Sequence, residues 1–521
     1  MSFSLYERRW RWLAAIALLA GIAAHFVPYF ADHDLWVDEA MLASSIINRD
    51  IYNLIAEPLD YGQSAPAGYL YIVKVITMAA GLSDFSLRIW SLVSFGMVLY
   101  LMYQILRNIY CVKHYLVFIA IFSLLGFYVR YALEFKPYMF ECVFVLLVVL
   151  LFNLCRRKRL SFLSFCVFCS VAVWFSFVPL FFIAGALLVI IFDTIKCHRT
   201  VKGLWPCILV AASLAVCYVV WLSATNGNAG AKAYWNLLAF PLLPVSLADC
   251  KLLFRMAKEM IVPAGGKIGI IFLPFSLYTL LCWLREDRQE AAFYLVSMGL
   301  LFVASSIGFY PIIARLMAFF GILVLTLAAV SLDRIWNKYE IYWQDNPRRL
   351  WGMLLAMALI VALPAASLGK NFYRGNLLYL KGSEIQPNIS YLNEHLQPED
   401  MIYISSGAQP VFFYKMNYPC GPGSWDSELI GTVAGKYIIG QVLCEYFYQK
   451  PYSYDYKIMM ERIDHDVDNV RKFSSVYLVT SHMDAEKTAY WQVFLQRLRK
   501  YGQVEIANVA YDTYLYHFEK K

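Results

Sequence analysis

Charged side chains are scarce in this sequence. Only 16% of its 521 residues are Asp, Glu, Lys or Arg, whereas 60% are hydrophobic. An ordinary soluble domain has about 25% charged residues and about 45–50% apolar ones. This shortage of charge excludes a soluble globular protein and predicts a polytopic α-helical membrane protein.

The few charges that are present do not point to an acidic partner. The formal net charge is +8, but Lys and Arg also collect in the cytoplasmic loops of membrane proteins, where they set the orientation. We therefore expect membrane lipids around the chain and no nucleic-acid partner.

The sequence also lacks a disulfide framework. Most of its twelve cysteines lie inside apolar runs, where a thiol packs as a small hydrophobe. Cys166 and Cys169 form a C-x-x-C pair within such a run, away from the turn that a redox or zinc site needs, so we interpret them as packing residues. Cys420 and Cys444 lie in the polar C-terminal region, and a disulfide between them is compatible with an extracytoplasmic location.

Long apolar runs are abundant. A helix of about 20 mostly apolar residues crosses a bilayer. About eleven runs meet this description: 10–28, 86–106, 115–131, 138–154, 161–178, 179–195, 204–222, 267–284, 290–308, 316–332 and 350–367. The first has the basic start of a signal peptide but no convincing cleavage site, so we expect an uncleaved helix. The run 66–82 is short and carries Lys74, and we expect it to lie in the outer interface.

Basic residues in the short loops predict the orientation. They precede the first run and recur in alternate later loops, at 156–159, 196–202 and 345–349. A cytoplasmic N-terminus places all of them on the cytoplasmic side, as the positive-inside rule requires. We therefore expect a multi-pass protein of the bacterial inner membrane, with these segments facing outward: 29–85, 131–137, 223–266, 309–315 and the C-terminal region.

A change in composition near residue 370 predicts two domains. Residues 1–369 form the predicted membrane domain, and residues 370–521 form a predicted extracytoplasmic α/β domain. Its predicted elements are buried strands at 400–406 and 475–481, an amphipathic helix at 485–502 and a terminal hairpin at 503–518.

Ionisable residues gather in the predicted outer loops. Asp38 and Glu39 follow the first span and precede a helical pattern. A cap at the start of that helix explains one carboxylate well, but it explains a pair of adjacent carboxylates less well. The other clusters hold Arg88, Glu134 with Lys136, and Arg315. Each cation alone has an ordinary alternative role as an interfacial anchor. Together, cations that bind phosphate oxygens and a carboxylate that accepts a proton suit a reaction on a lipid-phosphate sugar.

Four sequence segments resemble a known family. In order, they are "LWVDEAMLASSI", "SAPAGYLY", "SLRIWSLV" and "RYALEFKPYMFE". They resemble the first outer loop, second span and second outer loop of the GT-C glycosyltransferases, especially the protein O-mannosyltransferases and the bacterial aminoarabinose lipid A transferases. The resemblance covers about the first 150 residues well and the later spans by topology.

The resemblance implies an activity and roles for the charged residues. An enzyme of this kind transfers a hexose or pentose from a polyprenyl-phosphate donor to an extracytoplasmic protein, lipid or glycan acceptor, with inversion. Asp38 would be the catalytic base, and Glu39 would shape the same site. The donor phosphate would be bound by Arg88, Lys136 and Arg315.

The resemblance also implies residues that orient substrate: Glu134, Tyr138 and Tyr69. This sequence departs from the aminoarabinose enzymes at two places, where Ser64 and Met41 replace a Lys and an Arg. The phosphate contacts are therefore expected to differ, and the identity of the donor stays open.

No cofactor is expected. Asp32, His33, Asp34 and Asp38 form an oxygen-rich group that suits Mg²⁺ or Mn²⁺, but the O-mannosyltransferase-like enzymes are thought to act without a metal. We therefore do not favour a metal site.

Two other classes of function remain open from the sequence. A transporter or flippase of a lipid-linked or glycan substrate would also carry charged residues in its bundle, although the charges here gather at one face rather than at mid-membrane depth. A non-catalytic assembly protein would use the C-terminal domain to bind a partner.

Overall fold

The structure is a computed structural model of the chain. It describes residues 3–31, 34–198, 202–225, 239–344, 347–374, 384–405, 407–415, 429–433, 436–440, 456–481 and 485–521. The proposed Cys420–Cys444 pair therefore lies outside the described residues. The chain divides into two compact units: the first is Met1–Ala31, Ala65–Trp221 and Trp235–Leu378, and the second is Asp32–Ser64, Leu222–Tyr234 and Tyr379–Lys521.

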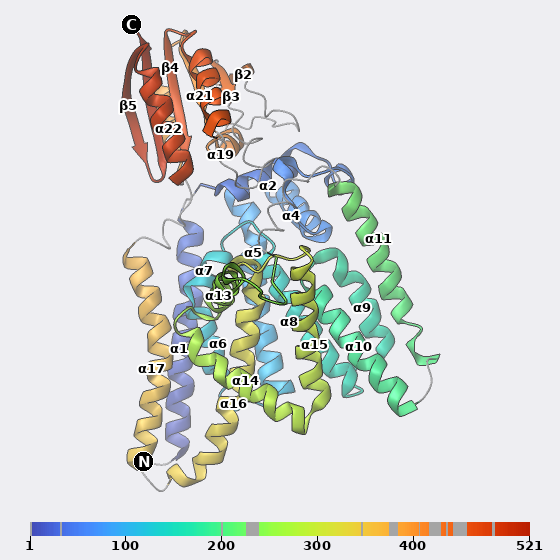
Figure 1. Cartoon of the computed structure of the whole chain (residues 1–521). Helices are drawn as coiled ribbons and strands as arrows, with labels where there is room; N and C mark the ends of the chain where they lie inside the picture. Colours follow the sequence, from blue (N-terminus) through green and yellow to red (C-terminus); the bar gives the residue numbers. More distant parts are fainter. Residues whose placement is uncertain are drawn as a thin grey trace. The chain divides into compact units, whose positions relative to one another are not determined.

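The first unit is a bundle of α-helices (Figure 1). Its helices are α1 Phe3–Phe30, α4 Ala67–Ala80, α5 Asp84–Tyr103, α6 Tyr115–Leu124, α7 Gly126–Tyr131, α8 Tyr138–Arg156, α9 Phe162–Phe175, α10 Pro179–His198, α11 Cys207–Thr225, α13 Leu247–Ile261, α14 Gly269–Glu286, α15 Arg288–Ser306, α16 Ala318–Gln344 and α17 Pro347–Tyr373.

Seven helical segments among the described residues are long and apolar enough to cross a membrane. They are Trp10–Phe30, Asp84–Ile109, Tyr138–Arg156, Pro179–Lys196, Gly269–Glu286, Arg288–Ser306 and Ala314–Tyr339. The multi-pass prediction is thus confirmed, but with fewer full-length spans than the eleven expected runs. Three of the four remaining runs correspond to shorter apolar helices. The fourth corresponds to α17, and the structure does not describe most side chains in the first half of that helix.

One interrupted run illustrates why the number differs. The predicted run 115–131 is interrupted because Leu125 has extended backbone between α6 and α7. Helix α4 forms where a short interfacial helix was expected, and its 14 residues are about 21 Å long. That length is below the roughly 30 Å of a hydrocarbon core.

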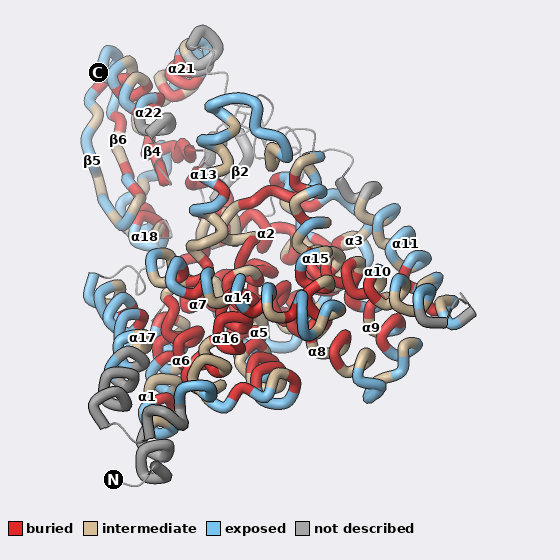
Figure 2. Tube along the Cα trace, turned by 60° about the horizontal axis from the view of Figure 1, so that its bottom comes forward, coloured by how far each residue is buried: buried red, intermediate tan, exposed pale blue. Residues whose placement is uncertain are grey.

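The centre of the bundle is formed by α16 and α8, whose residues are mostly buried (Figure 2). Hydroxyl groups connect α14 to α16: Ser276 Oγ donates to the Val324 carbonyl at 2.7 Å, and Thr279 Oγ1 donates to the Leu327 carbonyl at 2.7 Å. Small hydroxyl residues commonly join helices in membranes, because apolar contact alone gives little preference for protein over lipid.

The second unit contains a six-stranded mixed sheet in the order β2-β3-β1-β4-β6-β5. The strands are β1 Met401–Ile404, β2 Leu429–Val433, β3 Lys436–Gly440, β4 Ser475–Ser481, β5 Gly502–Ala510 and β6 Thr513–Lys520. Strand β1 is parallel to both β3 and β4, whereas β6 is antiparallel to β4 and β5. The two strands and the terminal hairpin predicted from the sequence are confirmed.

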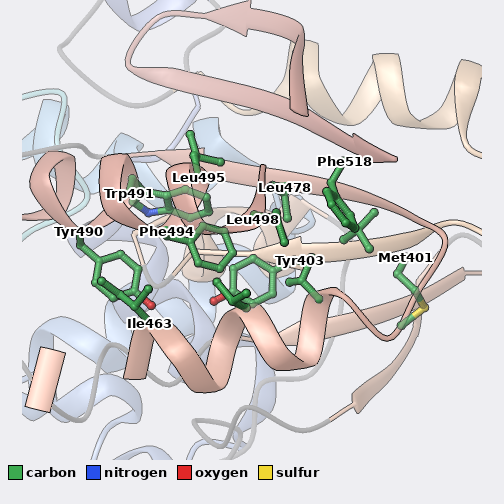
Figure 3. Close-up of a cluster of buried hydrophobic side chains, with 13 residues drawn as sticks. Met401, Tyr403, Ile463, Leu478, Tyr490, Trp491, Phe494, Leu495, Leu498 and Phe518 are labelled. Carbon is green, nitrogen blue, oxygen red and sulfur yellow. The ribbon is translucent and has the colours of Figure 1, made fainter. Parts of the chain in front are cut away.

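Helices α21 Tyr456–Val470 and α22 Ala485–Leu498 pack against this sheet (Figure 3). The amphipathic prediction at 485–502 is confirmed, with the helix ending at Leu498. Its buried face contributes Trp491 and Phe494, and the Phe494 ring stacks on Tyr403 of β1 with centroids 5.5 Å apart. The α/β domain thus has a hydrophobic core of its own.

The division of the chain differs from the boundary expected at residue 370. The first unit continues to Leu378, and residues 32–64 group with the C-terminal region. This segment contains α2 Val37–Asn48 and α3 Asn53–Ala56. Composition did not reveal this grouping, because it arises from contacts between segments that are distant in sequence.

Candidate functional site

Ser91 of α5 connects two of the predicted site segments. Its hydroxyl donates to the carbonyl oxygen of Glu134 at 2.6 Å and lies 3.3 Å from that of Lys136. Ser91 is three residues after Arg88, so both side chains lie on the same face of the helix. Arg88 and Lys136 are both buried. One face of α5 therefore carries Arg88 and fixes the loop that carries Glu134 and Lys136.

Aromatic packing brings α4 to the same loop. The Tyr69 ring is fully buried and stacks on Phe135, between Glu134 and Lys136, with centroids 6.1 Å apart. A second contact joins Tyr69 to Phe140 of α8, also at 6.1 Å. The predicted residue Tyr69 therefore lies against the loop in which Lys136 sits.

Glu134 forms an ion pair with Arg130. The guanidinium Nε lies 2.8 Å from Glu134 Oε1, and the same guanidinium covers the ring of Tyr131 at 5.7 Å from its centroid. Tyr131 in turn packs edge-to-face on Tyr138, with centroids 5.4 Å apart. The short helix α7 thus carries a cation and an aromatic ring into the group of predicted residues.

Arg315 belongs to the same group, although it lies far from these residues in the sequence. Burial raises the pKa of Tyr131 to about 12, and the charges of Glu134, Arg130, Arg315 and Glu259 act on the same hydroxyl. The 3₁₀ turn Ala314–Met317 carries Arg315, and its first amide donates to Glu259 Oε2 at 2.9 Å. The turn that presents Arg315 is therefore held by α13.

A further carboxyl group lies close to these residues. Glu141, in the first turn of α8, is buried. Burial raises the pKa of the Tyr310 hydroxyl, and the charges of Glu141 and Tyr138 raise it further. The Tyr310 hydroxyl donates to the Leu316 carbonyl at 2.6 Å, next to Arg315. Glu141 lies within the segment RYALEFKPYMFE, but the sequence alone predicts no role for it.

Asp38 and Glu39 lie in the second unit, on α2. The Glu39 carboxylate accepts the Trp36 backbone N–H at 2.8 Å and is almost fully buried, so it closes the first turn of the helix. Asp38 is only partly buried. Of the two adjacent carboxylates, Glu39 is thus the one that caps the helix, and Asp38 is the one that solvent reaches.

The oxygen-rich group that could suit a divalent ion divides between described and undescribed residues. Asp32 and His33 lie outside the described part of the chain. Asp34 is bound to protein groups: Lys415 Nζ lies 2.8 Å from Oδ1, and two backbone N–H groups donate to Oδ2. Within the described ranges, no group of three or more His, Cys, Asp or Glu side chains is placed to hold a metal ion.

The structure therefore brings six of the eight predicted residues into one unit: Tyr69, Arg88, Glu134, Lys136, Tyr138 and Arg315. Sequence reasoning missed Ser91 and Arg130. Arg130 and Glu134 are four residues apart, a spacing that favours ion pairs at a helix end, so this signal was available. Ser91 gave no comparable signal, because its partner is 43 positions away.

No family model matches this chain, and no curated protein matches its sequence. Two solved structures are similar to it over nearly their whole length. ArnT from Cupriavidus metallidurans in the apo state aligns with a TM-score of 0.55 and 14% identity, covering 97% of each chain. The same protein bound to undecaprenyl phosphate aligns with a TM-score of 0.53 and 13% identity, covering 97% of this chain and 98% of that one.

The chain has the fold of ArnT. This likeness confirms the expected GT-C architecture, a polytopic helical membrane domain followed by a C-terminal α/β domain. It also includes both units of the chain, since the alignment covers 97% of the residues.

Proposed function

We propose that this chain is an inverting glycosyltransferase that transfers a sugar from a polyprenyl-phosphate donor to an extracytoplasmic acceptor. The observation that carries the proposal is the connection through Ser91, which fixes the Lys136 loop to the Arg88 face of α5. Buried cations near an apolar bundle suit a ligand with an anionic head and a hydrophobic tail. The proposal is also supported by the likeness to the ArnT structure that contains undecaprenyl phosphate.

In the proposed reaction, Arg88, Lys136 and Arg315 bind the donor phosphate through charge-assisted hydrogen bonds. An acceptor hydroxyl or amine attacks the anomeric carbon from the face opposite the phosphate. The bond between that carbon and the phosphate oxygen breaks, and polyprenyl phosphate leaves. The Asp38 carboxylate accepts the proton of the attacking group.

The remaining predicted residues have supporting roles in this proposal. Tyr69 and Tyr138 orient the substrate, and Glu134, which pairs with Arg130, orients Lys136 or the acceptor. Glu39 holds the start of α2 and so helps to present Asp38. The protein would lie in the bacterial inner membrane with a cytoplasmic N-terminus and a periplasmic C-terminal domain. No cofactor takes part.

The test is a transfer assay with purified protein in lipid. A panel of radiolabelled polyprenyl-phosphate sugars is supplied with crude envelope acceptors, and the wild type is compared with Asp38→Asn. Loss of the general base is expected to lower kcat by about 10²–10⁴-fold. Glu57→Gln is the matched control, because Glu57 is an exposed carboxylate of the same outer segment.

Full activity in Asp38→Asn would contradict the assigned base. Binding of donors by the wild type without any consumption would contradict the transferase and favour a transporter or flippase.

A further inference from the structure

Helix α2, which carries Asp38, is built into the C-terminal domain. Nine of its twelve residues are buried, and it packs against α19 Gln409–Lys415. Six residues of α19 are buried as well. A helix of twelve residues is marginal alone in water, so its order depends on this packing.

Asp34 connects the entry of α2 to two different parts of the C-terminal domain. Its Oδ2 accepts the backbone N–H groups of Ile385 and Gln386, at 2.7 and 2.9 Å, where α18 Gln386–His395 begins. Its Oδ1 lies 2.8 Å from Lys415 Nζ at the end of α19. Asp34 is 7% exposed, and such a buried carboxylate is stable only when donors surround it.

The partners of Asp34 are themselves fixed to the sheet. Just before α18, the Glu384 N–H donates to the Tyr511 carbonyl at 3.1 Å, and the Glu384 carbonyl accepts the Thr513 hydroxyl at 2.8 Å. Tyr511 lies in the β5–β6 turn, and Thr513 is the first residue of β6. The start of α19 is fixed to the sheet through Ser405, the residue that follows β1. The Ser405 N–H donates to the Val479 carbonyl at 2.8 Å, and the Ser405 carbonyl accepts the Gln409 N–H at 2.9 Å.

The far end of α2 is closed by its own loop. Asp60 accepts a 2.6 Å hydrogen bond from Arg49 and a 2.9 Å bond from Ser44, and its backbone N–H donates to Ser45 Oγ at 2.9 Å. These contacts stay within residues 44–60. The connection to the C-terminal domain therefore depends on the Asp34 end of the helix and on α19.

We infer that Asp34 and Lys415 are positioning residues that hold Asp38 on the C-terminal domain. The domain then sets the place of the catalytic base. This inference rests on the proposed function, because it concerns the base of that reaction. Asp38 lies four residues after Asp34, so a displacement of the Asp34 end moves Asp38 directly.

The test uses the full chain in lipid. Lys415→Met leaves the Asp34 carboxylate without its cation, and we expect amide hydrogen exchange in α2 to accelerate by about tenfold or more. With the donor sugar identified by the transfer assay, kcat should fall while KM for that donor is unchanged, because the predicted phosphate-binding residues lie in the other unit. Lys415→Arg keeps the charge and should restore both readouts.

The matched control is Arg471→Met. Arg471 pairs with Asp468 on α21 at 2.8 Å, an ion pair of similar length within the same domain, and its loss should leave α2 exchange unchanged. Asp34→Asn provides a second variant, which keeps the shape of the side chain but removes its charge. Unchanged α2 exchange in both Lys415→Met and Asp34→Asn would overturn the inference. Accelerated α2 exchange in Lys415→Met, combined with a wild type that transfers no sugar, would support the positioning role of Asp34 and Lys415 and refute only the transferase.

Discussion

The hydroxyl of Ser91 donates a 2.6 Å hydrogen bond to the backbone carbonyl of Glu134. The bond is buried, and it joins α5 to a loop 43 residues later in the chain. A helix face with a buried arginine and a loop with a buried lysine are thereby held together before any ligand arrives. Such preorganisation reduces the ordering cost of binding an anion.

Ser91→Ala tests this connection. The change removes one of the hydrogen bonds to the Glu134 carbonyl, which also accepts the Lys136 backbone N–H at 2.8 Å. Loss of the Ser91 bond should cost about 1 kcal/mol and raise KM for the donor sugar about fivefold. KM and thermal unfolding are measured together. Ser94→Ala is the control, because the Ser94 hydroxyl donates to the Trp90 carbonyl of its own helix, at 2.7 Å. Equal effects of both variants would argue against a special role for Ser91.

The Arg130–Glu134 pair is suited to a double-mutant cycle. Arg130→Met leaves a nearly buried carboxylate without its cation, so it should destabilise more than Glu134→Gln. The side chain of Arg130 is 36% exposed, and solvent screening should hold the coupling to about 1 kcal/mol. Thermal unfolding of the two single variants and the double variant gives the coupling. Strictly additive effects would show that the pair contributes nothing.

Gly68→Ala tests the packing of α4, the helix that carries Tyr69. A Cβ at this position would lie 2.4 Å from Cδ1 of Phe175 in α9, so Gly68→Ala must displace α4 or the ring. Overpacking of this kind should cost about 1–3 kcal/mol and lower donor binding by moving Tyr69. Gly96→Ala is the matched control, since nothing lies within 4 Å of its Cβ, and Ala favours the helix by about 1 kcal/mol. The unfolding temperature should fall in Gly68→Ala and rise in Gly96→Ala.

Arg49→Met tests the closure of the loop after α2. Arg49 and Asp60 form a 2.6 Å ion pair in which both side chains are at most 5% exposed. Removing one member of a buried pair costs about 3–5 kcal/mol, and we expect faster proteolysis within residues 49–63. Arg334→Met provides the comparison, because its pair with Glu286 is exposed and should contribute at most about 1 kcal/mol. Similar proteolysis in both variants would contradict the prediction.

The amino-acid sequence alone determined the class of the protein and the type of most local elements. Apolar runs predict membrane helices because every backbone polar group in a bilayer must be bonded within the segment. The alternating pattern of the C-terminal region similarly predicted β4, the β5–β6 hairpin and α22. The motif around Lys136 was visible for the same reason, since its residues are neighbours in the chain.

Only the tertiary structure decided which of these elements belong together. Asp34 and Ile385 are 351 positions apart, yet they share a 2.7 Å hydrogen bond, and no periodicity or composition encodes such a partner. The same holds for Ser91, whose role depends on a carbonyl oxygen that every residue possesses. Side-chain patterns record local burial, whereas the assignment of α2 to the C-terminal domain depends on which surfaces pack when the whole chain folds.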